Sequence, residues 1–150
     1  MLTVPREMRF VGLPELPNAV VVRIEVPRGS FVKRRPDGRV DFVSPLPCPY
    51  NYGSIEGTKA SDGDPLDAIV LGARMPYGVR YLGTVRAAMA FVDDGELDAK
   101  IICSAAPLTD LDRRGIEAFL RVYAWLKRAL YLVRGRSGPT HVAGWIEPVE

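Results

Sequence analysis

The stretch Asp62-Gly63-Asp64-Pro65-Leu66-Asp67 places three carboxylates within six residues, directly before the apolar segment Ala68 to Leu71. Pro65 fixes the backbone after Asp64, so the stretch predicts a rigid turn from which a short strand enters the core. On its own, such a cluster is more often a solvated turn than a binding site. An EF-hand loop is excluded, because Leu66 and Asp67 would stand where that loop needs an oxygen ligand and a glycine.

A second acidic run lies downstream and is followed by a lysine: Asp93, Asp94, Glu96, Asp98 and Lys100. Side chains that repel one another this strongly are rarely crowded without a cation. If the two runs meet in space, their carboxylate oxygens are the hard ligands that Mg²⁺ or Mn²⁺ prefers, and these ions also bind phosphate oxygens. The sequence therefore predicts a divalent-metal site to which both runs contribute.

The composition is typical of one globular domain without a polyanionic partner. The 150 residues suffice for one ordinary core, and a net charge of +2 with no run of five like charges argues against a nucleic-acid surface. Met1 to Leu16 lacks the apolar core of a secretory signal, and later apolar runs are too short to span a membrane, so we expect a soluble cytoplasmic protein. Cys48 and Cys103 are expected to be buried free thiols, and His141 a structural or surface residue.

The pattern of apolar residues predicts many short strands and one long helix. Ala19 to Val26 is rich in β-branched residues, and Pro36-Asp37-Gly38 is a turn signal between Phe31 to Arg35 and Val40 to Val43. Further short strands are expected at residues 68–71, 79–89 and 99–103, and so many strands favour a small barrel. A helix is expected over residues 110–131 with Thr109 as its N-cap, because apolar residues recur there at three- and four-residue steps: Ile116, Phe119, Tyr123, Leu126 and Leu130.

A family resemblance joins these observations. Pro49-Tyr50-Asn51-Tyr52-Gly53, followed nine residues later by Asp62 to Asp67, resembles the signature of the soluble family I inorganic pyrophosphatases. The resemblance extends from Glu25-Val26-Pro27 to Gly144-Trp145, and so covers most of the chain. It implies a Mg²⁺-dependent hydrolase with a β-rich α+β fold, in which a five-stranded, OB-like closed barrel is flanked by helices. Bacterial members commonly form hexamers, so the resemblance also implies a homo-oligomer.

The resemblance assigns roles to individual residues. Asp62, Asp67 and Asp98 become ligands of the first metal ion, Asp67 touches a second, Asp93 and Asp98 hold a third, and Glu25 is a further candidate ligand. Asp64 becomes the general base that accepts a proton from the attacking water. Three residues match positions that hold the attacked phosphate, and one matches the leaving-phosphate pocket: Lys33, Tyr52 and Lys100, then Tyr131. Taken without the resemblance, Lys33 could belong to a solvated basic hairpin, Tyr52 to barrel packing, and Lys100 to an ion pair with Asp98.

Three departures from the family pattern surround the leaving group. Pro45 stands where an arginine usually clamps the leaving phosphate, and Leu132 follows Tyr131 where a lysine is usual, unless Arg134 or Arg136 substitutes. Arg35 replaces a glutamate that helps to hold a metal ion borne by the substrate, and could itself bind phosphate oxygens. The water-activating carboxylates and the attacked-phosphate donors remain. We therefore expect hydrolysis of pyrophosphate, with cleavage of a nucleotide or other organic diphosphate, or binding without turnover, as alternatives.

Two further expectations concern partners. An OB-like barrel can also serve as a module that binds single-stranded nucleic acid, but the acidic residues expected on the barrel face would repel nucleic acid. The long helix offers apolar surface on more than one side, at Tyr123, Trp125 and Leu130, which favours self-association. The sequence leaves the order of the oligomer open.

Overall fold

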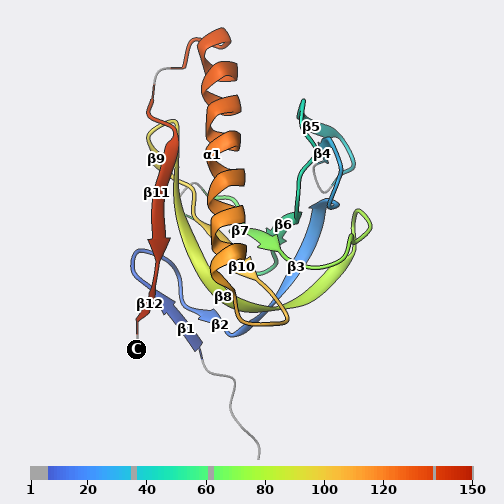
Figure 1. The fold of residues 1–150 in the computed structure, drawn as a ribbon, viewed down its shortest axis with the longest axis vertical. Helices are drawn as coiled ribbons and strands as arrows, with labels where there is room; N and C mark the ends of the chain where they lie inside the picture. Colours follow the sequence, from blue (N-terminus) through green and yellow to red (C-terminus); the bar gives the residue numbers. More distant parts are fainter. Residues whose placement is uncertain (1–6, 35–36, 61–62, 137, 150) are drawn as a thin grey trace, which may run out of the picture.

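The computed structural model describes residues 7–34, 37–60, 63–136 and 138–149. Its centre is a ring of five strands: β3 (Ala19–Val26), β6 (Asn51–Ile55), β7 (Asp67–Val70), β8 (Arg80–Asp93) and β10 (Lys100–Cys103) (Figure 1). Strands are hydrogen-bonded in the order β10-β7-β6-β3-β8, and β8 also pairs with β10, which closes the ring. The pairings are antiparallel except that of β7 with β10, which is parallel. The OB-like barrel predicted from the sequence is confirmed.

Shorter strands extend the ring or lie beside it. β11 (His141–Ile146) and β9 (Glu96–Leu97) pair with the long strand β8. β1 (Glu7–Phe10) lies between β2 (Leu16–Pro17) and β12 (Pro148–Val149) in a separate small sheet. The predicted hairpin is formed by β4 (Val32–Arg34) and β5 (Val40–Val43), and it projects from the ring opposite the helix (Figure 1).

The helix α1 (Asp110–Val133) begins where the sequence predicted. Thr109 caps it in a reciprocal pair of hydrogen bonds, in which the Asp112 backbone N–H donates to Thr109 Oγ1 and the Thr109 backbone N–H donates to Asp112 Oδ2, each at 3.0 Å. The buried face of α1 consists of Ile116, Leu120, Ala124 and Tyr131. Of the five apolar residues whose spacing predicted the helix, only Ile116 is fully buried, and the other four are partly buried.

Two residues of the Pro49 to Gly53 signature have structural roles. Asn51 is fully buried, and its Oδ1 accepts backbone N–H groups of Arg28 at 3.0 Å and Met75 at 2.9 Å, so it fixes two loops to the start of β6. Gly53 faces β3 so closely that a Cβ atom there would collide with the carbonyl group of Arg23. β6 was not among the predicted strands.

The core has two parts on either side of the barrel wall. One fills the barrel and includes Val22, Ile24 and Ile101; the other lies between the barrel and α1 and includes Phe91 and Leu120. Within the described ranges, no helix is long and apolar enough to cross a membrane.

Candidate active site

The centre of the site is a buried lysine at the start of β10. Lys100 is fully buried, and its Nζ donates hydrogen bonds to Asp67 Oδ2 at 2.8 Å, Asp98 Oδ2 at 2.7 Å and the Tyr52 hydroxyl at 2.8 Å. Asp67 and Lys100 are direct partners in the parallel pairing of β7 with β10. The two acidic runs of the sequence therefore meet in space, joined by one ammonium group.

The protonation of this cluster is set by burial and by the shared lysine. Burial alone would raise the pKa of Asp67, but Lys100 and Lys33 outweigh it and lower the pKa to about 2. Burial raises the pKa of Asp98, with Lys100 opposing it. Burial would lower the pKa of Lys100, yet Asp67 and its other neighbours hold it well above its ordinary value, so this lysine stays charged.

A second cluster lies where α1 passes the end of β8. Asp93 accepts hydrogen bonds from Lys127 Nζ and from the Tyr131 hydroxyl, each at 2.6 Å. The Tyr123 ring lies between the two clusters, with its centroid 5.9 Å from Lys100 Nζ and 5.0 Å from Lys127 Nζ. Burial raises the pKa of Asp93, but the two hydrogen bonds outweigh it and the pKa is lowered.

Sequence reasoning missed two of these residues, Tyr123 and Lys127. A count without gaps from Gly144-Trp145 led to Tyr131 and Leu132, and Leu132 is 81% exposed. The spacing of α1 held the signal, because residues at steps of four share one face of a helix, and Tyr123, Lys127 and Tyr131 follow at such steps. A cation therefore does lie beside Tyr131, but it comes from Lys127, one helical turn before Tyr131, and not from position 132.

Lys33 and Glu25 reach the site from β4 and β3. Lys33 Nζ lies 5.5 Å from the centroid of the Tyr52 ring and 3.8 Å from Asp41 Oδ2, with its side chain only 26% exposed. It is therefore a partly buried lysine rather than part of a solvated hairpin. Glu25 is buried, and its pKa is raised by that burial, against the opposing charge of Lys33.

The remaining predicted residues are placed less closely or not described. Asp64 is exposed, in the turn that leads into β7. Asp62 and Arg35 lie outside the described residues. Arg134 is the C-cap residue of α1, and Arg136 follows it, with its guanidinium 5.3 Å from the centroid of the Tyr131 ring.

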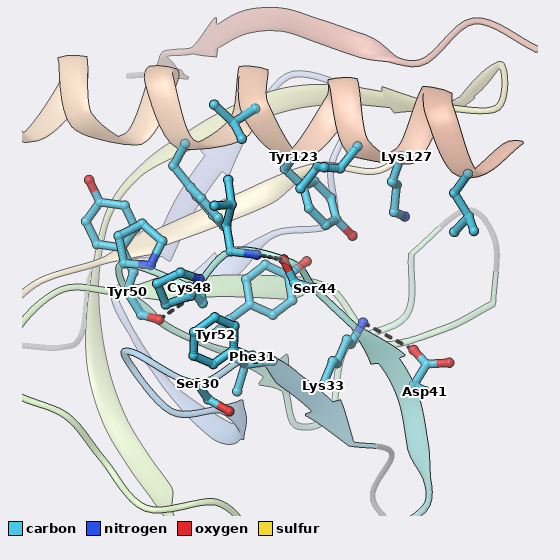
Figure 2. A pocket seen from close by; sticks show the side chains of 18 of the residues that line it. Ser30, Phe31, Lys33, Asp41, Ser44, Cys48, Tyr50, Tyr52, Tyr123 and Lys127 are labelled. Carbon is cyan, nitrogen blue, oxygen red and sulfur yellow. Dashed lines mark hydrogen bonds and ion pairs between the residues drawn. The ribbon is translucent and has the colours of Figure 1, made fainter. Parts of the chain in front are cut away.

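A groove opens beside the two clusters, between α1 and the segment that runs from β4 to β6. Its volume is about 600 Å³, and its lining includes Lys33, Tyr52, Tyr123 and Lys127. Figure 2 shows Lys33 and Lys127 toward one end of the groove, with Tyr50 toward the other. The candidate site is thus open to a small molecule through this groove.

The carboxylates suit a hard divalent cation in their chemistry. All of them offer oxygen, and the described residues place no cysteine or histidine among them. In the described ranges, however, no three acidic, histidine or cysteine side chains come close enough together to hold a metal ion. Lys100 donates a hydrogen bond to one carboxylate oxygen of Asp67 and to one of Asp98, and Asp93 accepts hydrogen bonds from Lys127 and Tyr131. Lysine ammonium groups thus supply the positive charge that crowded carboxylates require.

Comparison with known proteins gives one family. The family profile described as inorganic pyrophosphatase matches residues 21–128. The inorganic pyrophosphatase of Gluconobacter oxydans is 41% identical over 101 residues, which cover 59% of this chain and 56% of that protein. That of Picrophilus torridus is 37% identical over 98 residues, covering 60% of this chain and 55% of that protein. The matched part of the chain thus spans little more than half the length of these relatives.

Solved structures extend the similarity over more of the chain. The inorganic pyrophosphatase from Thermus thermophilus superimposes with a TM-score of 0.72 at 31% identity, covering 87% of this chain and 83% of that one. The enzyme from Neisseria gonorrhoeae gives a TM-score of 0.69 at 30% identity, covering 86% and 82%. The likeness therefore includes the barrel and extends beyond the matched sequence.

Proposed function

The chain belongs to the inorganic pyrophosphatase family, and we propose that it hydrolyses inorganic pyrophosphate to two phosphate ions. The observation that carries this proposal is the buried Lys100, which joins Asp67, Asp98 and Tyr52 in one hydrogen-bonded cluster beside an open groove. A lysine enclosed in this way keeps its charge fixed in space, and such preorganised charge stabilises a phosphoryl transition state.

We propose that Lys33 and Tyr52 contact the attacked phosphate and that Lys100 acts on it through its buried charge, with Asp64 as the general base. Water adds to one phosphorus atom while the bond from that atom to the bridging oxygen breaks, so the second phosphate leaves with that oxygen. Asp64 accepts the proton that the water loses, and its exposed position at a turn leaves it within reach of solvent. The charge that develops on the attacked phosphate is offset by the two ammonium groups.

Lys127 and Tyr131 are proposed to face the leaving phosphate. Both donate hydrogen bonds to Asp93, and both line the groove. Lys127 thus supplies a cation that the sequence pattern lacked at Leu132, while Arg136, close to the Tyr131 ring, extends the positive charge toward solvent.

Members of this family depend on metal ions, and we propose Mg²⁺, with Mn²⁺ as a substitute. The residues proposed to hold the metal are Glu25, Asp62, Asp67, Asp93 and Asp98. When bound, divalent ions of this type lower the pKa of water and neutralise phosphate oxygens. The support is the chemistry of the donors, since an all-oxygen set suits these ions.

The test is phosphate release from pyrophosphate with Mg²⁺, with Mn²⁺ and with EDTA. Asp64→Asn should lower kcat by about 10²- to 10⁴-fold, the usual contribution of a general base, while calorimetry shows Mg²⁺ binding retained. Asp110→Asn is the matched control, because Asp110 is an exposed aspartate at the start of α1, away from the clusters. Tight binding of pyrophosphate without turnover would instead identify a binding homologue.

We also propose that the protein is a cytoplasmic homo-oligomer. Trp125 is 62% exposed and Leu132 is 81% exposed, and both lie on α1. Large apolar side chains that stay exposed on one element favour contact with another subunit. Sedimentation velocity at micromolar concentration would show an oligomer, and a monomer under these conditions would contradict the proposal.

A further inference from the structure

The groove is much more apolar than a site for inorganic pyrophosphate requires. Along the first half of α1 its wall consists of Gly115, Ala118, Phe119 and Val122, and Leu126 and Leu130 continue it on the same side of the helix. The facing wall carries Phe31, Leu46, Pro47, Cys48, Pro49 and Tyr50. An inorganic anion needs hydrogen-bond donors or cations around every oxygen, so these walls offer it nothing.

Charge is confined to one end of the groove. Lys127, Arg134 and Arg136 belong to the later part of α1 and to the turn after it, and Lys33 faces Lys127 from β4. Among the lining residues that the structure describes, Asp41, beside Lys33, is the only acidic one. At about 1.5 Å per residue, the distance along the helix from Lys127 back to Gly115 is roughly 18 Å. The groove is therefore polarised, with a cationic head region and a long apolar tail region.

The sequence of α1 provides an independent sign that the tail region is a built surface. Phe119, Tyr123, Leu126 and Leu130 repeat as a core-facing stripe would, yet none of them is fully buried. The barrel is covered by a neighbouring stripe that contains Ile116, Leu120 and Ala124. The helix thus carries a second apolar stripe, and this stripe lines the groove.

We propose that an organic diphosphate monoester is a further substrate of this site and that the groove binds its hydrocarbon part. The inference rests on the proposed function, because it places the diphosphate group at Lys33 and Lys127, where the proposed function places pyrophosphate. Water adds to the terminal phosphorus, the bond from that atom to the bridging oxygen breaks, and the products are inorganic phosphate and the organic monophosphate. The leaving group keeps its ester bond, and its hydrocarbon chain lies along α1.

The lining favours a hydrocarbon chain over a nucleoside. Recognition of a base needs several fixed donors and acceptors, whereas the tail region offers mainly aromatic rings, aliphatic side chains and prolines. The hydroxyl group of Ser30 is already hydrogen-bonded within its own turn, to the backbone of Val32. A geranyl chain, which is apolar and flexible, matches these walls.

The first experiment compares four substrates with Mg²⁺: pyrophosphate, isopentenyl diphosphate, geranyl diphosphate and ADP. We expect kcat/KM to rise at least about tenfold from isopentenyl to geranyl diphosphate, since each methylene that leaves water gains affinity. Val122→Trp, which fills the tail region, should lower the ratio of geranyl diphosphate to pyrophosphate turnover by at least about tenfold. Arg121→Trp is the matched control, because Arg121 is exposed, adjacent in sequence and absent from the lining; it should leave the ratio unchanged.

The second experiment measures binding without turnover through a thiol in the groove. Cys48 lines the groove and is partly buried, whereas Cys103 is fully buried. Geranyl methylenediphosphonate, whose bridge cannot be hydrolysed, should slow alkylation of Cys48 at least about fivefold, as followed by intact mass. Methylenediphosphonate without the chain should not protect it, and Cys48→Ser should remove the signal.

The outcomes separate the two proposals. Turnover of pyrophosphate with no dependence on chain length and no protection of Cys48 would overturn the groove inference and leave the proposed function standing. Protection without turnover of any diphosphate would reject the proposed hydrolysis and retain the hydrocarbon site. Preference for ADP over geranyl diphosphate would overturn the hydrocarbon assignment, and so would dissociation of an oligomer by Val122→Trp, because a second subunit would then occupy the groove.

Discussion

Replacing Lys100 by methionine tests the electrostatic balance of the site. The substitution keeps an unbranched side chain of similar length but removes the ammonium group that joins Asp67 and Asp98. Removing one partner of a buried ion pair lowers the free energy of unfolding by about 3–5 kcal/mol, because the other charge is left unpaired. Total stabilities of about 5–15 kcal/mol are usual, so we expect a folded but much weakened protein.

The pKa of Asp67 gives a separate, lower value for this effect. A carboxyl group whose pKa falls from 3.8 to about 2 on folding stabilises the native state by about 2 kcal/mol above pH 4. That stabilisation is lost as the pH falls toward 2. The pKa of Asp98 is already raised by burial, and without Lys100 burial should raise the pKa of Asp67 as well, so the folded variant should take up a proton that the unfolded chain does not hold. The free energy of unfolding of the variant should therefore fall as the pH rises from about 4 to this raised pKa.

The assay is urea unfolding in EDTA at several pH values, followed by circular dichroism. Lys59→Met is the control, because Lys59 is exposed and its loss should change the free energy of unfolding by less than about 0.5 kcal/mol. Equal stability of Lys100→Met and the wild-type protein, with the same pH dependence, would refute the idea that Lys100 balances the buried carboxylates.

Three further predictions concern the helix, the barrel and the second cluster. Thr109→Ala removes the N-cap of α1 and should cost about 1 kcal/mol, measured by thermal unfolding, whereas Thr109→Ser should restore most of it. Gly53→Ala should prevent folding or cost several kcal/mol, since its Cβ would collide with the backbone of Arg23; soluble yield and circular dichroism would show this, and a native-like variant would contradict so close an approach of β6 to β3. Lys127→Met should raise the Mg²⁺ affinity measured by calorimetry while lowering kcat for pyrophosphate, because Asp93 loses its counter-ion; unchanged binding and turnover would show that Lys127 has no part in the site.

The sequence predicted the elements whose patterns were local. Ala19 to Val26 became β3 within the expected bounds, and Thr109 caps α1, because β-branched runs and capping residues act over a few positions. β6 was missed because four of its five residues are buried, so it lacks the alternation of polar and apolar residues that marks a half-exposed strand. Its glycine is required by a neighbouring strand, a fact that only tertiary contact reveals.

The site was predicted best where a motif fixed the spacing. The acidic runs meet as expected, and the sequence offered the ion pair of Lys100 with Asp98 as an alternative, but that Lys100 would also bind Asp67 could not be deduced from residue order. Lys127 was missed because a count without gaps ignores which face of α1 looks into the groove. The roles of all the site residues stay predictions, and Asp62 and Arg35 lie outside the described residues.

The parallel seam between β7 and β10 has a consequence for folding. Asp67 and Lys100 are direct partners at this seam, which joins segments far apart in the chain and completes the ring. A slip of one residue between these strands would turn the side chains of the slipped strand to the opposite face, separate Lys100 from Asp67 and leave a charge in apolar surroundings without this partner. Only one alignment of β7 with β10 escapes that penalty. The charges proposed to serve hydrolysis thus also favour the correct alignment of β7 with β10 in the closed barrel.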